Sequence, residues 1–271
     1  MIYFAMDEIG FESMEKIKAI ASESDRWQFI YDTAKAYGFE GIHITPSLYE
    51  SFELDLNNMP DYFQDFKLTF HFGRIYRILS ENDVGLLDKE LEHAFKIVLK
   101  HKMHDISVHP PYSENLTLAE KNLCLKFFHR IIEKWLKIAL QRGISLSLET
   151  HVTSEYFVFD ELGEYVKFID MYPELGVLID ISHNYYNPEY SEEDMINLLG
   201  GKNVKGLHIS DALRGADFRK GTHLAVGDGT VDFAKLLNHF AKIPDLYGVL
   251  EIKSSNGGIS RSLKSLKEML C

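Results

Sequence analysis

Short apolar runs typical of β-strands recur eight times along the chain, and this repetition constrains the fold more than any other feature. Successive runs start about 27 to 44 residues apart, the length of one strand, one crossover helix and two loops. The eight predicted strands are Ile2–Met6, Gly41–Thr45, Leu68–Phe72, Asp105–His109, Ile144–Glu149, Gly176–Ile181, Val204–Ser210 and Gly248–Ile252.

Helical patterns fill most of the gaps between these runs. The clearest covers Thr117–Gln141, where Thr117 and Glu120 form a capping box and Gly143 ends the pattern. The gap Pro46–Lys67 shows little periodicity, so its helix is expected to be short or irregular. The other predicted helices are Trp27–Tyr37, Val84–Leu99, a short helix capped by Ser191, Val231–Phe240 capped by Thr230, and a last helix from Gly257-Gly258 to Leu270.

Eight strands that alternate with helices predict a parallel sheet that closes on itself. The runs lack strict alternation, which is typical of strands buried on both faces. An open doubly wound sheet usually carries a glycine-rich phosphate loop after its first strand, and Met6-Asp7-Glu8-Ile9-Gly10 is not one. With 271 residues and no linker-like stretch, we predict an α/β fold with one (β/α)₈ TIM barrel spanning 1–271.

Composition excludes several classes of protein. The only cysteines are Cys124 and Cys271, so a disulfide framework or a thiolate metal site is excluded. A net charge of −12 disfavours nucleic acid as a partner and favours a small molecule. No apolar run is long enough to span a membrane, and the first residues turn acidic at Asp7, unlike a signal peptide, so we expect a cytoplasmic protein without a membrane partner.

Reactive side chains follow six consecutive predicted strands, at the point where each strand ends. A TIM barrel brings these ends to one rim, where its chemistry takes place. A single histidine there is usually an ordinary hydrogen-bonded residue, but six strand ends in succession indicate a site. The residues are His71, His109, Glu149, Asp180 with His183, His208 with Asp211, and Glu251 with Lys253.

Three of these residues are carboxylates, and their meeting at one rim predicts a metal. Burying Glu149, Asp180 and Glu251 together would be costly unless a cation neutralised them. Carboxylates with imidazole suit Mn²⁺ or Zn²⁺ first, with Mg²⁺ and Co²⁺ as alternatives. We expect His93, His101, His104, His129 and His239 to be ordinary exposed or capping residues, and leave the roles of His43 and His151 open.

Several short motifs carry a resemblance to a known family. They are Leu148-Glu149-Thr150, Ile179-Asp180-Ile-Ser-His183, Leu207-His208-Ile-Ser-Asp211, Leu250-Glu251-Ile and the stretch from Gly221 to Phe233 that contains His223. In this order, over essentially the whole chain, they resemble the xylose isomerase-like TIM-barrel superfamily, which contains sugar isomerases and epimerases, inosose dehydratases and endonuclease IV.

The resemblance implies a metal-dependent sugar, or sugar-phosphate, isomerase or epimerase. Glu149, Asp180, His208 and Glu251 match the four ligands of the single metal in ketose 3-epimerase-like members. That metal would hold a substrate carbonyl and a neighbouring hydroxyl, while Glu149 and Glu251 exchange the carbon-bound proton. Gly227 and Gly229 would form the turn before the seventh helix, with Asp232 in its first turn. The implied substrate-binding residues are His71, His109, His183, Asp211, His223 and Lys253.

The same superfamily offers an alternative, an endonuclease IV-like phosphodiesterase acting on abasic DNA. Such enzymes use histidines of strands three and four, matched by His71 and His109, for a second metal bridged by Glu149. Their third metal needs an Asp-x-His pair, where this chain has Gly221-Thr222-His223, and Asp217 could substitute only in a differently folded loop. We therefore expect at most two metals and a carbohydrate substrate. A third reading, binding without turnover, is disfavoured because both acid-base glutamates are present.

Overall fold

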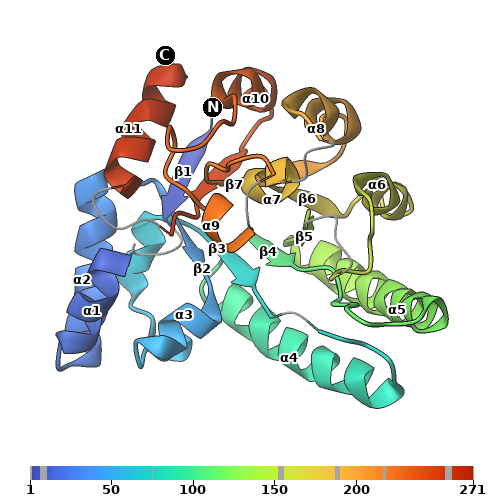
Figure 1. Cartoon of the computed structure of the whole chain (residues 1–271). Coiled ribbons are helices and arrows are strands. Elements are labelled where there is room, and N and C mark those ends of the chain that lie inside the picture. The colour runs from blue at the N-terminus through green and yellow to red at the C-terminus, as the bar shows by residue number, and fades with distance from the viewer. Residues whose placement is uncertain are drawn as a thin grey trace.

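The chain folds into a closed barrel, described by a computed structural model over residues 2–6, 11–74, 76–151, 156–186, 190–215, 218–253 and 258–270. Within these residues eight parallel strands pair in chain order, and the last pairs with the first (Figure 1). The strands are β1 (Tyr3–Met6), β2 (Gly41–Ile44), β3 (Lys67–Phe72), β4 (Asp105–Val108), β5 (Ser145–Glu149), β6 (Gly176–Asp180), β7 (Val204–Ile209) and β8 (Tyr247–Leu250). The predicted (β/α)₈ TIM barrel is confirmed.

Helices alternate with the strands along the chain. Most of them surround the barrel on the outside, with colours that run round it in chain order in Figure 1, and a short one at 218–221 lies near the centre of that view. They are α1 (Phe11–Ala19), α2 (Glu23–Tyr37), α3 (Pro46–Ser51), α4 (Glu81–Lys100), α5 (Leu118–Arg142), α6 (Leu162–Asp170), α7 (Ile181–Tyr186), α8 (Glu192–Leu199), α9 (Phe218–Gly221), α10 (Phe233–Phe240) and α11 (Gly258–Met269), with 3₁₀ turns η1 (Leu56–Asn58) and η2 (Asp61–Asp65). No helix in these ranges combines the length and apolarity needed to cross a bilayer.

The helix ends mostly follow the signals in the sequence. Thr117 and Glu120 form the predicted capping box of α5, and Gly143 ends that helix in the left-handed region at φ 67°. Ser191 caps α8 as predicted. The gap before β3 holds only α3 and two 3₁₀ turns, as its weak periodicity indicated.

The predicted cap of one helix is wrong, and two other helices begin earlier than predicted, α2 at Glu23 instead of Trp27 and α4 at Glu81 instead of Val84. Thr230 was expected to cap the helix before β8, but Asp232 caps it, because its carboxylate accepts from the backbone N–H of Lys235 at 3.0 Å. Thr230 instead belongs to the preceding loop, where its N–H donates to the carbonyl of Ala212 at 2.9 Å.

The interior of the barrel is filled by a separate cluster of buried side chains at its amino-terminal end. Tyr3, Leu178, Tyr247 and Val249 belong to it. The Tyr247 hydroxyl donates to buried Asp105 at 2.8 Å, which holds the tyrosine ring against the bare backbone of Gly206. The interior is therefore a packed core below the rim.

This packing predicts that Gly206→Ala destabilises the barrel whereas Gly85→Ala, in the second turn of α4, stabilises it. A methyl group on Gly206 would lie 2.2 Å from a ring carbon of Tyr247, but one on Gly85 meets nothing within 4 Å. We expect a loss of about 1–3 kcal/mol for the first and a gain of about 0.5–1 kcal/mol for the second. Urea unfolding measures both, and a Gly206→Ala variant as stable as wild type would contradict this packing.

Candidate metal centre

The side-chain alternation of the strands carries four polar residues to one rim. Each of the four lies two positions after a residue whose side chain faces the barrel interior. Side chains two positions apart in a strand point to the same side of the sheet. The pairs are Ser147 and Glu149, Leu178 and Asp180, Gly206 and His208, and Val249 and Glu251. The four strands β5 to β8 are consecutive in the barrel, so the second members of these pairs gather above the core.

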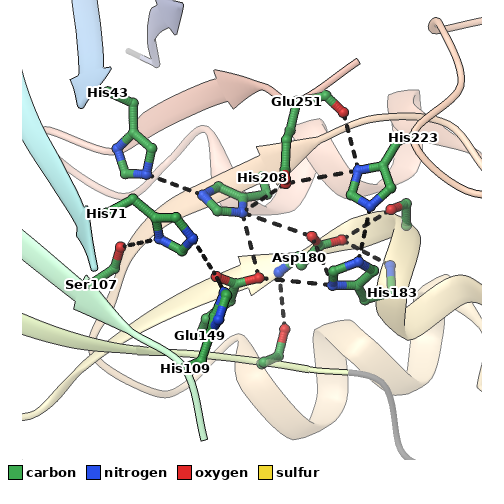
Figure 2. Close-up of polar contacts among 12 residues, drawn as sticks. His43, His71, Ser107, His109, Glu149, Asp180, His183, His208, His223 and Glu251 are labelled. Atoms are coloured by element: carbon green, nitrogen blue, oxygen red, sulfur yellow. Dashed lines mark hydrogen bonds and ion pairs between the residues drawn. The ribbon is translucent and has the colours of Figure 1, made fainter. Parts of the chain in front are cut away.

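His208 lies at the centre of this group (Figure 2). Its Nδ1 is 3.1 Å from Oε2 of Glu251, 3.6 Å from Oε1 of Glu149 and 3.7 Å from Oδ2 of Asp180. Glu149, Asp180 and His208 are almost completely buried, and their ligand atoms all lie within 4.8 Å of one another. Glu251 joins this trio through His208, at the more exposed edge of the group.

Three of the atoms that face one another here lack hydrogen bonds. Oδ2 of Asp180, Nδ1 of His208 and Oε2 of Glu251 are buried without a hydrogen-bond partner among the described residues, and Oε1 of Glu149 faces His208 beside them. Buried polar groups normally have such partners. Metal bonds of about 2.0–2.2 Å place neighbouring ligand atoms about 3 to 3.5 Å apart. The donor set and the spacing of Glu149, Asp180 and His208 therefore fit one divalent metal ion, with Glu251 placed beside them 3.1 Å from His208.

The neighbouring backbone aims Asp180 into the group. Oδ1 of Asp180 accepts from the N–H of His183 at 2.8 Å and from the Ser182 hydroxyl at 3.1 Å, which leaves Oδ2 facing His208. The N–H of Asp180 donates to the hydroxyl of Thr150 at 2.9 Å. Helix α7, which the sequence analysis did not predict, starts at once after Asp180 and supplies the His183 N–H.

Opposite charges hold the group together in the absence of a metal. Burial opposes ionisation of Glu149, but His109 and His208 lower the pKa of Glu149 well below its usual range. Burial acts likewise on Glu251, yet His208 and His223 lower its pKa well below the usual range. Burial also opposes protonation of His208, but Glu149 and Glu251 raise its pKa well above 6.5. A proton on His208 thus supplies positive charge among the carboxylates, as a metal cation would.

A second cluster adjoins the first through Glu149. Oε2 of Glu149 lies 3.0 Å from Nε2 of His109 and 3.7 Å from Nε2 of His71. Nδ1 of His71 is 2.9 Å from the hydroxyl of Ser107, which orients the ring. His71, His109 and Glu149 can offer three ligand atoms within 4.8 Å, so the structure brings together the residues expected for a second metal.

His183 and His223 meet on the other side of Asp180. Their Nε2 atoms are 3.0 Å apart, and Nδ1 of His183 lies 3.0 Å from Oδ2 of Asp180. His223 adopts φ 56°, an uncommon conformation for a residue other than glycine. Within the described part of the chain, no group of three metal-ligating atoms includes His223. Asp217, the substitute ligand considered for a third metal, lies outside the described residues.

Asp211 and Lys253 were also expected to contact substrate. Both oxygens of Asp211 accept from backbone N–H groups, Oδ1 from Ala212 at 2.8 Å and Oδ2 from Gly227 at 2.9 Å. A methyl group on Gly229 would lie 2.3 Å from Oδ1 of Asp211. We infer that Asp211 holds this loop in shape rather than contacting substrate. Lys253 is exposed, and its backbone N–H donates to the carbonyl of His223 at 2.9 Å.

Two histidines whose roles the sequence left open lie in the site. His43 is fully buried inside the barrel, with Nε2 3.3 Å from Nε2 of His208. The ring of His151 stacks on His183 at 4.5 Å between centroids. The signal for His43 was an imidazole within the apolar strand Gly41–Ile44, where a core residue was expected. The histidines expected away from the rim, His93, His101, His104, His129 and His239, all lie in or beside helices or before a strand.

Comparison with known proteins agrees with the barrel fold. The model of the family "Xylose isomerase-like TIM barrel" matches residues 8–269. The chain belongs to this family. A sequence search of curated proteins found no match.

Solved structures resemble the whole barrel. A D-tagatose 3-epimerase-like protein aligns with a TM-score of 0.77 and 18% identity over 99% of this chain and 97% of its own. The IOLI protein with a zinc atom aligns with a TM-score of 0.74 and 14% identity over 99% of this chain and 96% of its own. An AP endonuclease of family 2 from Brucella melitensis aligns with a TM-score of 0.72 and 13% identity over 99% of both chains. At these identities the likeness concerns the fold.

The hydrogen bonds of Asp180 predict how a variant at this position binds metal. In Asp180→Asn, the His183 N–H and the Ser182 hydroxyl hold the amide oxygen, so the NH₂ group, which is no metal ligand, faces His208. We expect the zinc content after reloading, measured by elemental analysis, to lie about one ion per chain below that of wild type. Asp105→Asn, at an equally buried aspartate at the other end of the barrel, is the matched control and should keep its zinc. Equal zinc in both variants would contradict the site.

The raised pKa of His208 predicts that metal binding releases a proton. A group whose pKa is raised well above 6.5 carries a proton at neutral pH, and Nδ1 must lose it to bind a metal. Zinc affinity should therefore fall by about tenfold for each unit of pH below the pKa of His208. Calorimetric titration in buffers of different ionisation enthalpy should give about one proton released per zinc near pH 7. Binding without proton release would show that His208 is neutral in the metal-free protein or is no ligand.

Proposed function

We propose that this chain is a divalent-metal-dependent sugar, or sugar-phosphate, isomerase or epimerase that transfers a proton at the carbon next to a carbonyl. One observation carries the proposal: carboxylate and imidazole atoms of Glu149, Asp180, His208 and Glu251 face one another at the rim, and those of Asp180, His208 and Glu251 are buried without hydrogen-bond partners. Mn²⁺ and Zn²⁺ suit this donor set best, with Mg²⁺ and Co²⁺ as alternatives. The likeness to an epimerase-like structure and to a zinc-containing one supports the same class.

Glu149 and Glu251 are the proposed acid-base pair. They lie on either side of His208 in Figure 2, on strand β5 and directly after β8. A divalent cation bound there supplies the Lewis acidity that makes a hydrogen next to a carbonyl exchangeable. A carboxylate oxygen of one glutamate takes this hydrogen from one face of the carbon, and the other glutamate returns a proton to the opposite face.

The histidines around the group suit an uncharged polyol. Burial lowers the pKa of His71 to about 3 and also lowers the pKa of His183. Neutral imidazoles offer one donor and one acceptor each, which matches sugar hydroxyls. We propose that His71, His109, His183 and His223 bind substrate hydroxyls, with Lys253 at the edge of the site.

The second candidate is a phosphodiesterase that acts on abasic DNA. The cluster of His71, His109 and Glu149, which could hold a second metal, and the likeness to the Brucella melitensis structure favour it. The net charge of −12 and the glycine at position 221 disfavour it. Neutral histidines also attract a phosphate backbone less than lysine or arginine would.

The acid-base assignment predicts the behaviour of two glutamine variants. Glu149→Gln and Glu251→Gln keep their size and one possible ligand oxygen, so metal and sugar binding should remain. Turnover of a ketose should fall by at least ~10²-fold, because a carboxamide cannot exchange protons. Glu268→Gln, at an exposed glutamate of α11, is the control and should retain full turnover.

Solvent deuterium separates the mechanisms. Wild-type enzyme in D₂O should place deuterium on the carbon next to the carbonyl, as seen by NMR of the product. Turnover without deuterium would indicate hydride transfer between carbons and would contradict the two-glutamate assignment. Metal-dependent nicking of an abasic duplex that His109→Ala abolishes would favour the phosphodiesterase instead.

A further inference from the structure

His43 is a buried imidazole to which the proposed function gives no task. It lies within β2, inside the barrel and below the rim, and Figure 2 shows it on the side of His208 away from the carboxylates. Its Nε2 is 3.3 Å from Nε2 of His208, and its Nδ1 is 2.5 Å from the hydroxyl of Thr69. Three side chains from β2, β3 and β7 thus form a chain of polar contacts that begins at the metal centre and ends in the core.

The direction of the hydrogen bonds in this chain follows from the metal centre. A metal takes an unprotonated ring nitrogen, and Nδ1 of His208 is the nitrogen that faces Glu149, Asp180 and Glu251. Nε2 of a ligating His208 must then carry the ring proton and donate it. The only atom placed to accept it in these contacts is Nε2 of His43.

The same logic sets the tautomer of His43. A buried imidazole without a carboxylate partner is costly to charge, so His43 holds one proton. Because its Nε2 accepts from His208, that proton lies on Nδ1 and is donated to the Thr69 hydroxyl oxygen. With the ring proton of His208 on Nε2 and that of His43 on Nδ1, both polar contacts of His43 become hydrogen bonds. The opposite tautomer of His43 would place two N–H groups against each other.

We propose that His43 is a positioning residue that fixes the tautomer and ring orientation of His208 for metal binding, with Thr69 fixing His43 in turn. The proposal rests on the metal site of the proposed function. Partners of this kind commonly change metal affinity by about 10- to 100-fold. A carboxylate in place of His43 would make His208 a more basic ligand and would add another buried negative charge to three carboxylates. A neutral acceptor orients the ring without that charge.

The tautomers can be read in the wild-type protein without any substitution. With ¹⁵N-labelled histidine and zinc bound, NMR should show the ring proton of His208 on Nε2 and that of His43 on Nδ1. A proton on Nε2 of His43 would overturn the proposal. Ser107→Ala removes the corresponding hydroxyl partner of His71 and should leave the tautomers of His208 and His43 unchanged.

Two substitutions at position 43 separate the hydrogen bond from simple filling of space. His43→Leu fills the volume without an acceptor and should weaken zinc binding by about 10- to 100-fold. His43→Gln keeps an acceptor oxygen near the position of Nε2 and should restore most of the affinity. Equal loss in both variants, or no loss in either, would overturn the proposal.

The zinc count distinguishes the failure of this proposal from the failure of the proposed function. Wild-type protein that takes up no zinc overturns both. Wild-type protein that binds zinc as tightly as His43→Leu overturns the role of His43 alone. A zinc ion located by anomalous diffraction between His43, His71 and His208 would make His43 a metal ligand and would equally overturn the positioning role.

Discussion

Three carboxylates are buried close together at one end of the closed barrel, and the rest of the site depends on how their mutual repulsion is offset. Glu149 and Asp180 are withdrawn from water almost completely, and Glu251 is largely so. Charges of like sign in such a place destabilise the fold unless a cation lies between them. The protonated His208 supplies part of that positive charge. A divalent metal would supply more and would bind the unpartnered atoms of Asp180, His208 and Glu251.

The barrel geometry explains why so much could be predicted from the sequence. The carboxyl ends of the parallel strands all lie at one rim of the closed barrel, and every second residue of a strand faces the interior. The positions of Glu149, Asp180 and His208 at the ends of their strands are therefore enough to predict that they meet. The strands themselves were visible as apolar runs, and their observed ends differ from the predicted ones by only one or two residues. No knowledge of the substrate was needed for either step.

Other features depend on contacts that no local pattern reveals. His43 and His208 are 165 positions apart, and their contact follows from the closure of the barrel. Asp211 was expected to contact substrate, but its carboxylate accepts a hydrogen bond from the backbone N–H of Gly227. This contact exists only once the loop is folded. The choice between Thr230 and Asp232 as a helix cap likewise depends on the geometry of the last loop residues.

In the proposed enzyme, the charged group and the neutral histidines His71 and His183 beside it have different tasks. The carboxylates and His208 bind the metal and exchange a proton, while His71 and His183 offer uncharged donors and acceptors to a polyol. The most direct test is anomalous diffraction at the zinc edge from zinc-loaded crystals. The account predicts one full peak bounded by Glu149, Asp180, His208 and Glu251, with at most one more beside His71 and His109. Three full peaks, or zinc bound elsewhere while these four residues stay free of metal, would contradict it.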